Sequence, residues 1–287
     1  MNIVNIGHVC IDHNISEHAS YTSSGGASTF MAKIFSKIPD IDYTVVSHYG
    51  KDFEPYKKDL KIYPNEPIHE KTLVYQNIHK FGNREQKALN RDNSAEVALD
   101  DNLKSLLSKA DVVIISPLLP NYSRDYLKSL MECVRPDAIK LLLPQGYFRD
   151  FDQDDNVLVR DFLEFKEIIP LANFIIVSEK DSDEPYTDTY RWLNLCDIST
   201  IVTMSERGAE YKSRSSAYEV PTDPVPEDKI IDSVGSGDIF SASFIYQFAK
   251  SGNIVQSIGF ANMVARECLY YTSEQLTSVE LESLTFH

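Results

Sequence analysis

Strand-like apolar runs alternate with helix-like runs along most of the chain, and this alternation constrains the fold more than any other feature. The predicted strands are 2–7, 42–50, 110–116, 138–144, 173–178 and 197–204. The predicted helices are 25–38, 123–134, 157–168, 186–195, 237–250 and 253–271, with a weaker one at 273–283. Because strands that alternate with helices pair in parallel and are covered on both faces, the sequence predicts an α/β fold with a mainly parallel sheet.

Two segments depart from this alternation. Residues 72–90 alternate in polarity and contain a Phe-Gly-Asn-Arg turn, which predicts a hairpin. A second, shorter hairpin is predicted at 208–221. The surroundings of the first hairpin, residues 66–92, are polar and charged. We therefore expect this region to form a flap over one edge of the sheet rather than a layer of the core.

Length and composition fit one large domain. The chain has 287 residues, of which 43% are hydrophobic, and this is enough for a sizeable core. Its net charge of −15 argues against a nucleic-acid or acidic-membrane surface. The four cysteines form no CxxC pair, and the first residues lack the basic start of a signal peptide. No apolar run is long enough to cross a bilayer, so we expect a cytoplasmic protein with reduced thiols.

The stretch IDSVGSGDIFSASF, residues 231–244, places Gly235, Ser236 and Gly237 between two acidic residues at the start of a predicted helix. Helix N-termini carry unpaired amide donors and partial positive charge, and glycines let backbone approach a phosphate closely. Asp238 would then accept a proton from an attacking hydroxyl while the amides of 235–238 stabilise a transferring phosphoryl group. Helix capping explains Asp238 equally well, but it does not explain the glycines.

The segment DSVGSGD resembles the D-T-x-G-A-G-D signature of the ribokinase-like (PfkB) carbohydrate kinases, with Ser233 and Ser236 in place of Thr and Ala. The resemblance extends over nearly the whole chain. It implies a ribokinase-like three-layer α/β/α sandwich, in which residues 1–287 form one kinase domain. Residues 66–92 would supply most of its β flap, with 13–24 as a candidate addition.

The start of the chain carries a second part of the resemblance. In this family an Asp after the first strand binds sugar hydroxyls, and a Gly-Gly pair precedes the first helix. Asp12, Gly25 and Gly26 match this pattern. An ordinary turn would also explain the two glycines. Phe30 stands where ribokinases carry a polar amide, which argues against ribose itself.

The nucleotide and metal positions are matched less completely. TMSERGAEY, residues 203–211, resembles the family's T-x-G-x-x-G loop through Thr203 and Gly208, and a β-turn is the other interpretation. VSEKD, residues 177–181, stands where the family has N-x-x-E. Ser178 and Asp181 would replace Asn and Glu, with Glu179 as a rival carboxylate for water-mediated Mg²⁺ binding. Asn262 is a candidate for the adenine pocket.

The segment LLLPQGYFRDFD, residues 141–152, follows a strand at the expected acceptor pocket. Gln145 and Arg149 are candidate contacts to a polyol or a phosphate, and a surface ion pair is the alternative for Arg149. Together with GGASTF, residues 25–30, and HEKTLVY, residues 69–75, this segment is most similar to the inositol-kinase branch of the family.

The resemblance implies an ATP- and Mg²⁺-dependent kinase that phosphorylates a sugar, cyclitol or nucleoside. The acceptor is expected to be neutral or modestly charged, because no dense Lys/Arg cluster lies near the acceptor loops. A homodimer through the flap is also implied. The main alternative is a pseudokinase that binds sugar or nucleotide without catalysis. A kinase of vitamin-like heterocycles is a third interpretation, against which Asp12 and Gly-Gly argue.

Overall fold

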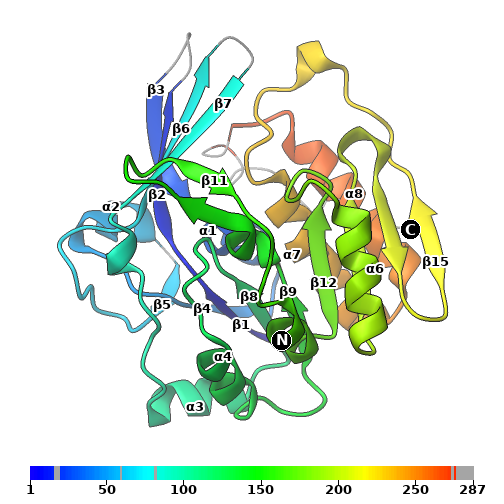
Figure 1. Cartoon of the computed structure of the whole chain (residues 1–287), viewed down its shortest axis with the longest axis horizontal. Helices are drawn as coiled ribbons and strands as arrows, with labels where there is room; N and C mark the ends of the chain where they lie inside the picture. Colours follow the sequence, from blue (N-terminus) through cyan, green and yellow to red (C-terminus); the bar gives the residue numbers. More distant parts are fainter. Residues whose placement is uncertain (16–19, 59, 81–82, 273–274, 276–287) are drawn as a thin grey trace.

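The computed structural model describes residues 1–15, 20–58, 60–80, 83–272 and 275 (Figure 1). Within these residues, nine strands form the main sheet in the order β15-β14-β13-β12-β9-β8-β1-β4-β5. The strands are β1 (Asn2–Gly7), β4 (Asp42–Val46), β5 (Lys61–Tyr63), β8 (Val112–Ser116), β9 (Ile139–Leu142), β12 (Phe174–Ser178), β13 (Ser199–Thr203), β14 (Ala209–Lys212) and β15 (Ala217–Val220). Strands from β13 to β5 pair in parallel, and β14 and β15 add an antiparallel edge. The predicted mainly parallel sheet is confirmed.

Helices cover both faces of this sheet (Figure 1). They are α1 (Ala27–Phe35), α2 (Glu54–Lys57), α3 (Asp101–Ser108), α4 (Arg124–Met131), α5 (Phe165–Ile168), α6 (Pro185–Leu195), α7 (Ser236–Ser251) and α8 (Ile254–Cys268). Successive residues of β1 point to opposite faces. Ile3 packs in one core cluster with residues of α1, α7 and α8, whereas Val4 packs in another with residues of α3, α4 and α6. The three-layer α/β/α architecture is therefore confirmed.

A separate four-stranded sheet lies beside the main sheet, in the order β3-β2-β6-β7. Its strands are β2 (Cys10–Ile15), β3 (Ser20–Gly25), β6 (Val74–Lys80) and β7 (Asn83–Leu89). The predicted hairpin at 72–90 is present as the antiparallel pair β6 and β7. A buried apolar cluster that includes Cys10, Leu73, Tyr75 and Leu118 packs this small sheet against the loop after β8.

The helix predicted at 157–168 is wrong for most of its length. Residues Val157–Val159 form β11, which pairs with β10 (Arg149–Phe151), and only α5 at Phe165–Ile168 is helical. Val157 and Val159 are β-branched and favour a strand, and the partner strand supplies the hydrogen bonds that a helix would have made internally. The helix predicted at 273–283 lies outside the described residues, apart from 275.

All four cysteines are free. Across the part of the chain that the structure describes, no helix combines the length and apolarity needed to cross a membrane.

Candidate active site

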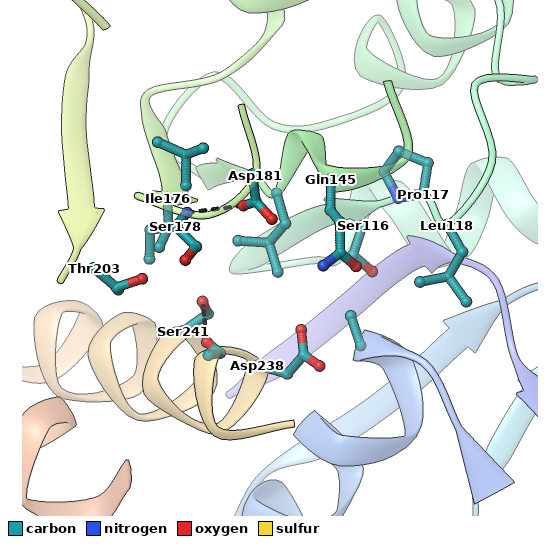
Figure 2. Close-up of a pocket in the computed structure, with 14 residues that line it drawn as sticks. Ser116, Pro117, Leu118, Gln145, Ile176, Ser178, Asp181, Thr203, Asp238 and Ser241 are labelled. Carbon is teal, nitrogen blue, oxygen red and sulfur yellow. Dashed lines mark hydrogen bonds between the residues drawn. The ribbon is translucent and has the colours of Figure 1, made fainter. Parts of the chain in front are cut away.

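One pocket opens where the carboxyl ends of several parallel strands meet the start of α7 (Figure 2). Ligands of open α/β sheets typically bind at this edge. Asp238 and Ser241 on α7 face Ser178 and Asp181 across the pocket. The lining residues are Ala27, Ser116, Pro117, Leu118, Leu143, Gln145, Ile176, Val177, Ser178, Asp181, Thr203, Gly237, Asp238 and Ser241.

The start of α7 leaves backbone amides free to bind a ligand. Gly235 precedes the helix with a φ of 79°, a left-handed conformation that glycine adopts without strain. The Ser236 amide donates to Ser233 O (3.2 Å), and the Ile239 amide donates to Gly235 O (2.9 Å). Among the described residues, the amides of Gly237 and Asp238 have no acceptor. These two donors, at the positive end of a helix dipole, can bind an anion.

The glycines on the two sides of Ser236 have different surroundings. A Cβ on Gly235 would lie 2.3 Å from Cδ1 of Phe30, so the Phe30 ring packs directly against this residue. A Cβ on Gly237 would have no atom within 4 Å. The turn is therefore supported from α1 on one side and open toward the pocket on the other.

The Asp238 carboxyl is partly buried and has a strongly perturbed acidity. Burial, followed by the nearby carboxylates of Asp181 and Asp12, raises its pKa to about 7, and the positive charge of Arg149 opposes this shift. A carboxylate with a pKa near the working pH is suited to act as a general base. A plain capping role would not require an acid surrounded by like charges in a pocket.

Asp181 lies across the pocket from α7. Its Oδ2 accepts a hydrogen bond from the Ser178 amide (2.8 Å). Burial raises the Asp181 pKa, whereas this hydrogen bond and the Arg149 charge lower it. Glu179, the rival carboxylate, pairs instead with Arg207.

The residues fit a magnesium ion bound mainly through water and phosphate. Mg²⁺ is commonly held by one or two carboxylates together with substrate phosphates, and Asp181 supplies one such carboxylate in the pocket. The described residues contain no group of three or more His, Cys, Asp or Glu side chains placed to hold a metal by themselves. An ion at this site would therefore depend on the bound donor for most of its ligands.

Asp12 lies on β2, opposite Ser23 of β3, and is only 5% exposed. Its Oδ1 accepts a hydrogen bond from Cys10 Sγ (3.4 Å). A Cβ on Gly25 would lie 2.1–2.3 Å from the Asp12 carboxylate atoms, so only glycine leaves room for that side chain. Gly26, with a φ of 87°, precedes α1. The Asp12 charge acts on Asp238, but neither Asp12 nor the two glycines line the pocket.

The other predicted contacts fall into two groups. Gln145, Ser178 and Thr203 line the pocket. Gly208, Asn262 and Arg149 do not. Arg149 donates to the Tyr75 hydroxyl and the Leu118 carbonyl oxygen, and the two others also have a structural explanation. A Cβ on Gly208 would lie 2.2 Å from the Val220 carbonyl oxygen, and the buried Asn262 amide donates to that same oxygen (3.0 Å). Nucleotide contacts from these two residues stay a prediction.

Sequence reasoning missed Ser116, Leu118 and Ser241 as lining residues. Ser241 follows Asp238 by three positions on a helix, a spacing that places both side chains on one face. Ser116 ends β8, and Leu118 follows it in the next loop. The sequence could have indicated Ser116 and Leu118, because residues at the carboxyl ends of parallel strands line the ligand site of such sheets.

Comparisons with known proteins identify the family. The sequence profile of the pfkB family of carbohydrate kinases matches residues 67–280. A 5-dehydro-2-deoxygluconokinase of Clostridium beijerinckii is 28% identical over 101 residues, which cover 35% of this chain. The matched segment spans only 28% of that relative's length.

Several solved structures share the fold. A pyrophosphate-dependent kinase in the ribokinase family, complexed with a pyrophosphate analog and myo-inositol, has a TM-score of 0.76 at 16% identity, covering 96% of this chain and 100% of the other. Ribokinase from Giardia lamblia has a TM-score of 0.75 at 14% identity, covering 99% of each chain.

Proposed function

Because the chain belongs to the pfkB family of carbohydrate kinases, we propose that it transfers the γ-phosphoryl group of ATP to a hydroxyl of a sugar, an inositol-like cyclitol or a nucleoside. One observation carries this proposal. The Asp238 carboxyl, whose pKa is about 7, lies in the same pocket as the two free amides that begin α7.

In the proposed step, the Asp238 carboxylate accepts the hydroxyl proton as the acceptor oxygen attacks the γ-phosphorus. The bond from that phosphorus to the bridging oxygen breaks, and ADP leaves. The amides of Gly237 and Asp238 donate to the oxygens of the migrating group, where preorganised dipoles are most effective. Mg²⁺, held through water by Asp181, would neutralise phosphate charge.

Pyrophosphate is the second candidate donor. Two solved structures with this fold are described as pyrophosphate-dependent kinases of the ribokinase family. Both donors present a terminal phosphoryl group on a phosphoanhydride, so Asp238 and the α7 amides would act identically. Thr203 and Ser178 line the pocket, and we expect them to contact either donor through its phosphates.

At the acceptor end, Asp12 and the Gly25–Gly26 turn are proposed to hold the substrate, together with Gln145. The small sheet of β2, β3, β6 and β7 would cover this end as the flap of a single kinase domain. Homodimer formation through that sheet and a cytoplasmic location stay predictions.

The test is a release assay with ATP or pyrophosphate as donor, over a panel of sugars, cyclitols and nucleosides. We expect acceptor-dependent release of ADP or phosphate that Asp238→Asn abolishes. Asp223→Asn, which changes an exposed acid bound to Arg266, is the matched control and should behave like the wild type. Tight binding without turnover in both the wild type and Asp238→Asn would instead support a non-catalytic binding protein.

A further inference from the structure

We propose that Ser116, at the carboxyl end of β8, accepts a hydrogen bond from a neutral hydroxyl of the acceptor, so that this side of the pocket selects hydroxyl groups and excludes phosphate. The inference rests on the proposed function, because it concerns the same pocket. It deepens that function by assigning a residue that determines acceptor specificity.

A chain of buried hydrogen bonds fixes the direction in which the Ser116 hydroxyl points. The Tyr43 hydroxyl donates to the Ser28 carbonyl oxygen (2.9 Å), and it accepts from Asn5 Nδ2 (2.8 Å). The same Nδ2 donates to Met31 Sδ (3.5 Å), and a thioether sulfur can only accept. Both neighbours of Nδ2 therefore require a donor, which fixes the orientation of the buried Asn5 amide.

The oxygen of this amide is the partner of Ser116. Asn5 Oδ1 accepts a hydrogen bond from Ser116 Oγ (2.7 Å). Because an amide oxygen has no hydrogen to donate, the single hydrogen of the Ser116 hydroxyl lies on this bond and two lone pairs remain. Gly7 pairs with Ser116 in the sheet register, and a Cβ on Gly7 would lie 2.3 Å from Ser116 Oγ and 2.8 Å from Asn5 Oδ1. The glycine thus leaves room for this hydrogen bond.

Ser116 lines the pocket on the side opposite Asp238 (Figure 2). The residue is only 1% exposed, so a ligand inside the pocket, rather than bulk water, would meet its oxygen. Hydrogen bonds are stronger, and unmatched polar groups costlier, in such buried surroundings. The lone pairs of Ser116 Oγ attract a hydroxyl hydrogen, whereas they repel the oxygens of an ionised phosphate, which offer only lone pairs.

Ser178, at the carboxyl end of β12, lines the same pocket with the opposite polarity. Its Oγ accepts from the Lys180 amide (3.2 Å), and its hydrogen has no acceptor within the described part of the chain. This hydroxyl can donate to a phosphate oxygen, as can the Gly237 and Asp238 amides. Donors at Ser178 and at the start of α7 therefore suit a phosphate, whereas Ser116 suits a hydroxyl.

The experiment measures binding by calorimetry for the wild type, Ser116→Ala, Ser178→Ala and the control Ser108→Ala. Ser108 is an exposed serine whose hydroxyl donates to the Ser105 carbonyl oxygen. The probes are inorganic pyrophosphate, myo-inositol, D-glucose and the analogues of both polyols in which fluorine replaces one hydroxyl at a time. Fluorine is close to a hydroxyl in size but cannot donate a hydrogen bond. Melting curves check that each variant is folded.

We expect Ser116→Ala to weaken polyol binding about 3- to 10-fold and pyrophosphate binding by less than about twofold, because a neutral hydrogen bond is lost. Ser178→Ala should do the reverse, and Ser108→Ala should match the wild type. In the wild type, fluorine at one ring position should weaken binding by about tenfold or more, since Ser116 Oγ would then face a second acceptor. In Ser116→Ala this penalty should fall to within about twofold.

A fluorine penalty of equal size in the wild type and Ser116→Ala at every position would overturn the inference. Equal losses of polyol and pyrophosphate binding in Ser116→Ala, or a wild type that binds neither polyol, would also overturn it. Release of phosphate or ADP is measured in parallel. Fluorine discrimination that depends on Ser116 without turnover would refute the kinase proposal and leave the role of Ser116 standing, and turnover without that discrimination would do the opposite.

Neutron diffraction from crystals exchanged into D₂O checks the hydrogen-bond direction without any ligand. We expect the deuterium on Ser116 Oγ to point at Asn5 Oδ1. A deuterium that points into the pocket would make Ser116 a donor and contradict the inference.

Discussion

Two helices of this protein begin after a glycine with a positive φ, and they differ in how much space surrounds their first turn. Gly26 precedes α1 with a φ of 87°, and Gly235 precedes α7 with a φ of 79°. A Cβ on Gly26 would lie 2.9 Å from a Leu118 methyl carbon and 3.0 Å from the His8 carbonyl oxygen. A Cβ on Gly235 would be at least as crowded, 2.3 Å from Cδ1 of Phe30. The first turns differ, because Ala27 and Ser28 of α1 are buried, whereas a Cβ on Gly237 of α7 would meet nothing within 4 Å. The first turn of α1 is thus enclosed by the fold, and that of α7 is open.

A glycine before a helix therefore indicates a backbone conformation, but it does not indicate whether that conformation serves packing or ligand binding. At α1 the glycines allow close packing, including the buried Asp12 carboxylate against Gly25. At α7 they leave amide donors uncovered. Phe30 of α1 packs against Gly235, so the enclosed start also supports the open one. We therefore expect substitutions at α7 to change chemistry and substitutions at α1 to change stability.

The largest effect is expected for Asp238→Asn. Loss of the base should lower kcat about 10²- to 10⁴-fold, as is usual for a removed general base. Steady-state kinetics and a melting curve measured together check this, since the variant should remain as folded as the wild type. A kcat within about threefold of the wild-type value would contradict the role of Asp238 as the base and leave it only a helix-capping role.

Gly237→Ala tests the open start itself. The methyl group would project where the structure has no neighbouring atom, so we expect no loss of stability and a gain of about 0.5–1 kcal/mol from helix propensity. We expect kcat to fall by about tenfold or more, since the methyl obstructs phosphate approach to the adjacent amides. Denaturant titration and kinetics provide the two readouts. Unchanged kinetics would contradict a role for these amides.

Gly26→Ala is the matched change at the enclosed start. The alanine would be strained at a φ of 87° and would crowd Leu118 and the His8 carbonyl, so unfolding free energy should fall by about 1–3 kcal/mol. Urea unfolding at constant pH measures this. A variant as stable as the wild type would show that the start of α1 is less tightly enclosed than described.

The pH profile gives the most graded effect. Because the Asp238 pKa is about 7, kcat/KM should fall about tenfold per unit below that pH. The ordinary value is 3.8, so the folded state binds more protons between roughly pH 4 and 7. Stability from this group should therefore be lost as pH rises through that window, and Asp238→Asn should not show the loss. A kcat/KM that stays flat down to pH 5 would contradict the raised pKa.

Much of the fold could be predicted from the sequence, because the spacing of apolar residues within each segment indicates whether that segment forms a strand or a helix. β1 and α6 begin and end within a residue of their predicted bounds. The segment 157–168 failed because its strand pairs with residues 149–151, and local periodicity does not encode that pairing. Short edge strands depend on their partners more than helices do.

The site residues could be predicted only where several of them are adjacent in one sequence motif. Asp238 and Gly237 were identified because the glycines and the carboxylate are adjacent in sequence. The contact of Phe30 with Gly235 joins residues more than 200 positions apart, and no local pattern reveals it. For the same reason, the sequence did not show that Arg149 donates to the Tyr75 hydroxyl and the Leu118 carbonyl oxygen.

A crystal structure with a non-hydrolysable donor analogue and a bound acceptor would show whether the start of α7 binds the migrating phosphoryl group. We expect the terminal phosphate within hydrogen-bond distance of the Gly237 and Asp238 amides, with the acceptor hydroxyl beside the Asp238 carboxylate. A terminal phosphate bound away from α7, or an Asp238 carboxylate that contacts only protein atoms in that complex, would contradict it.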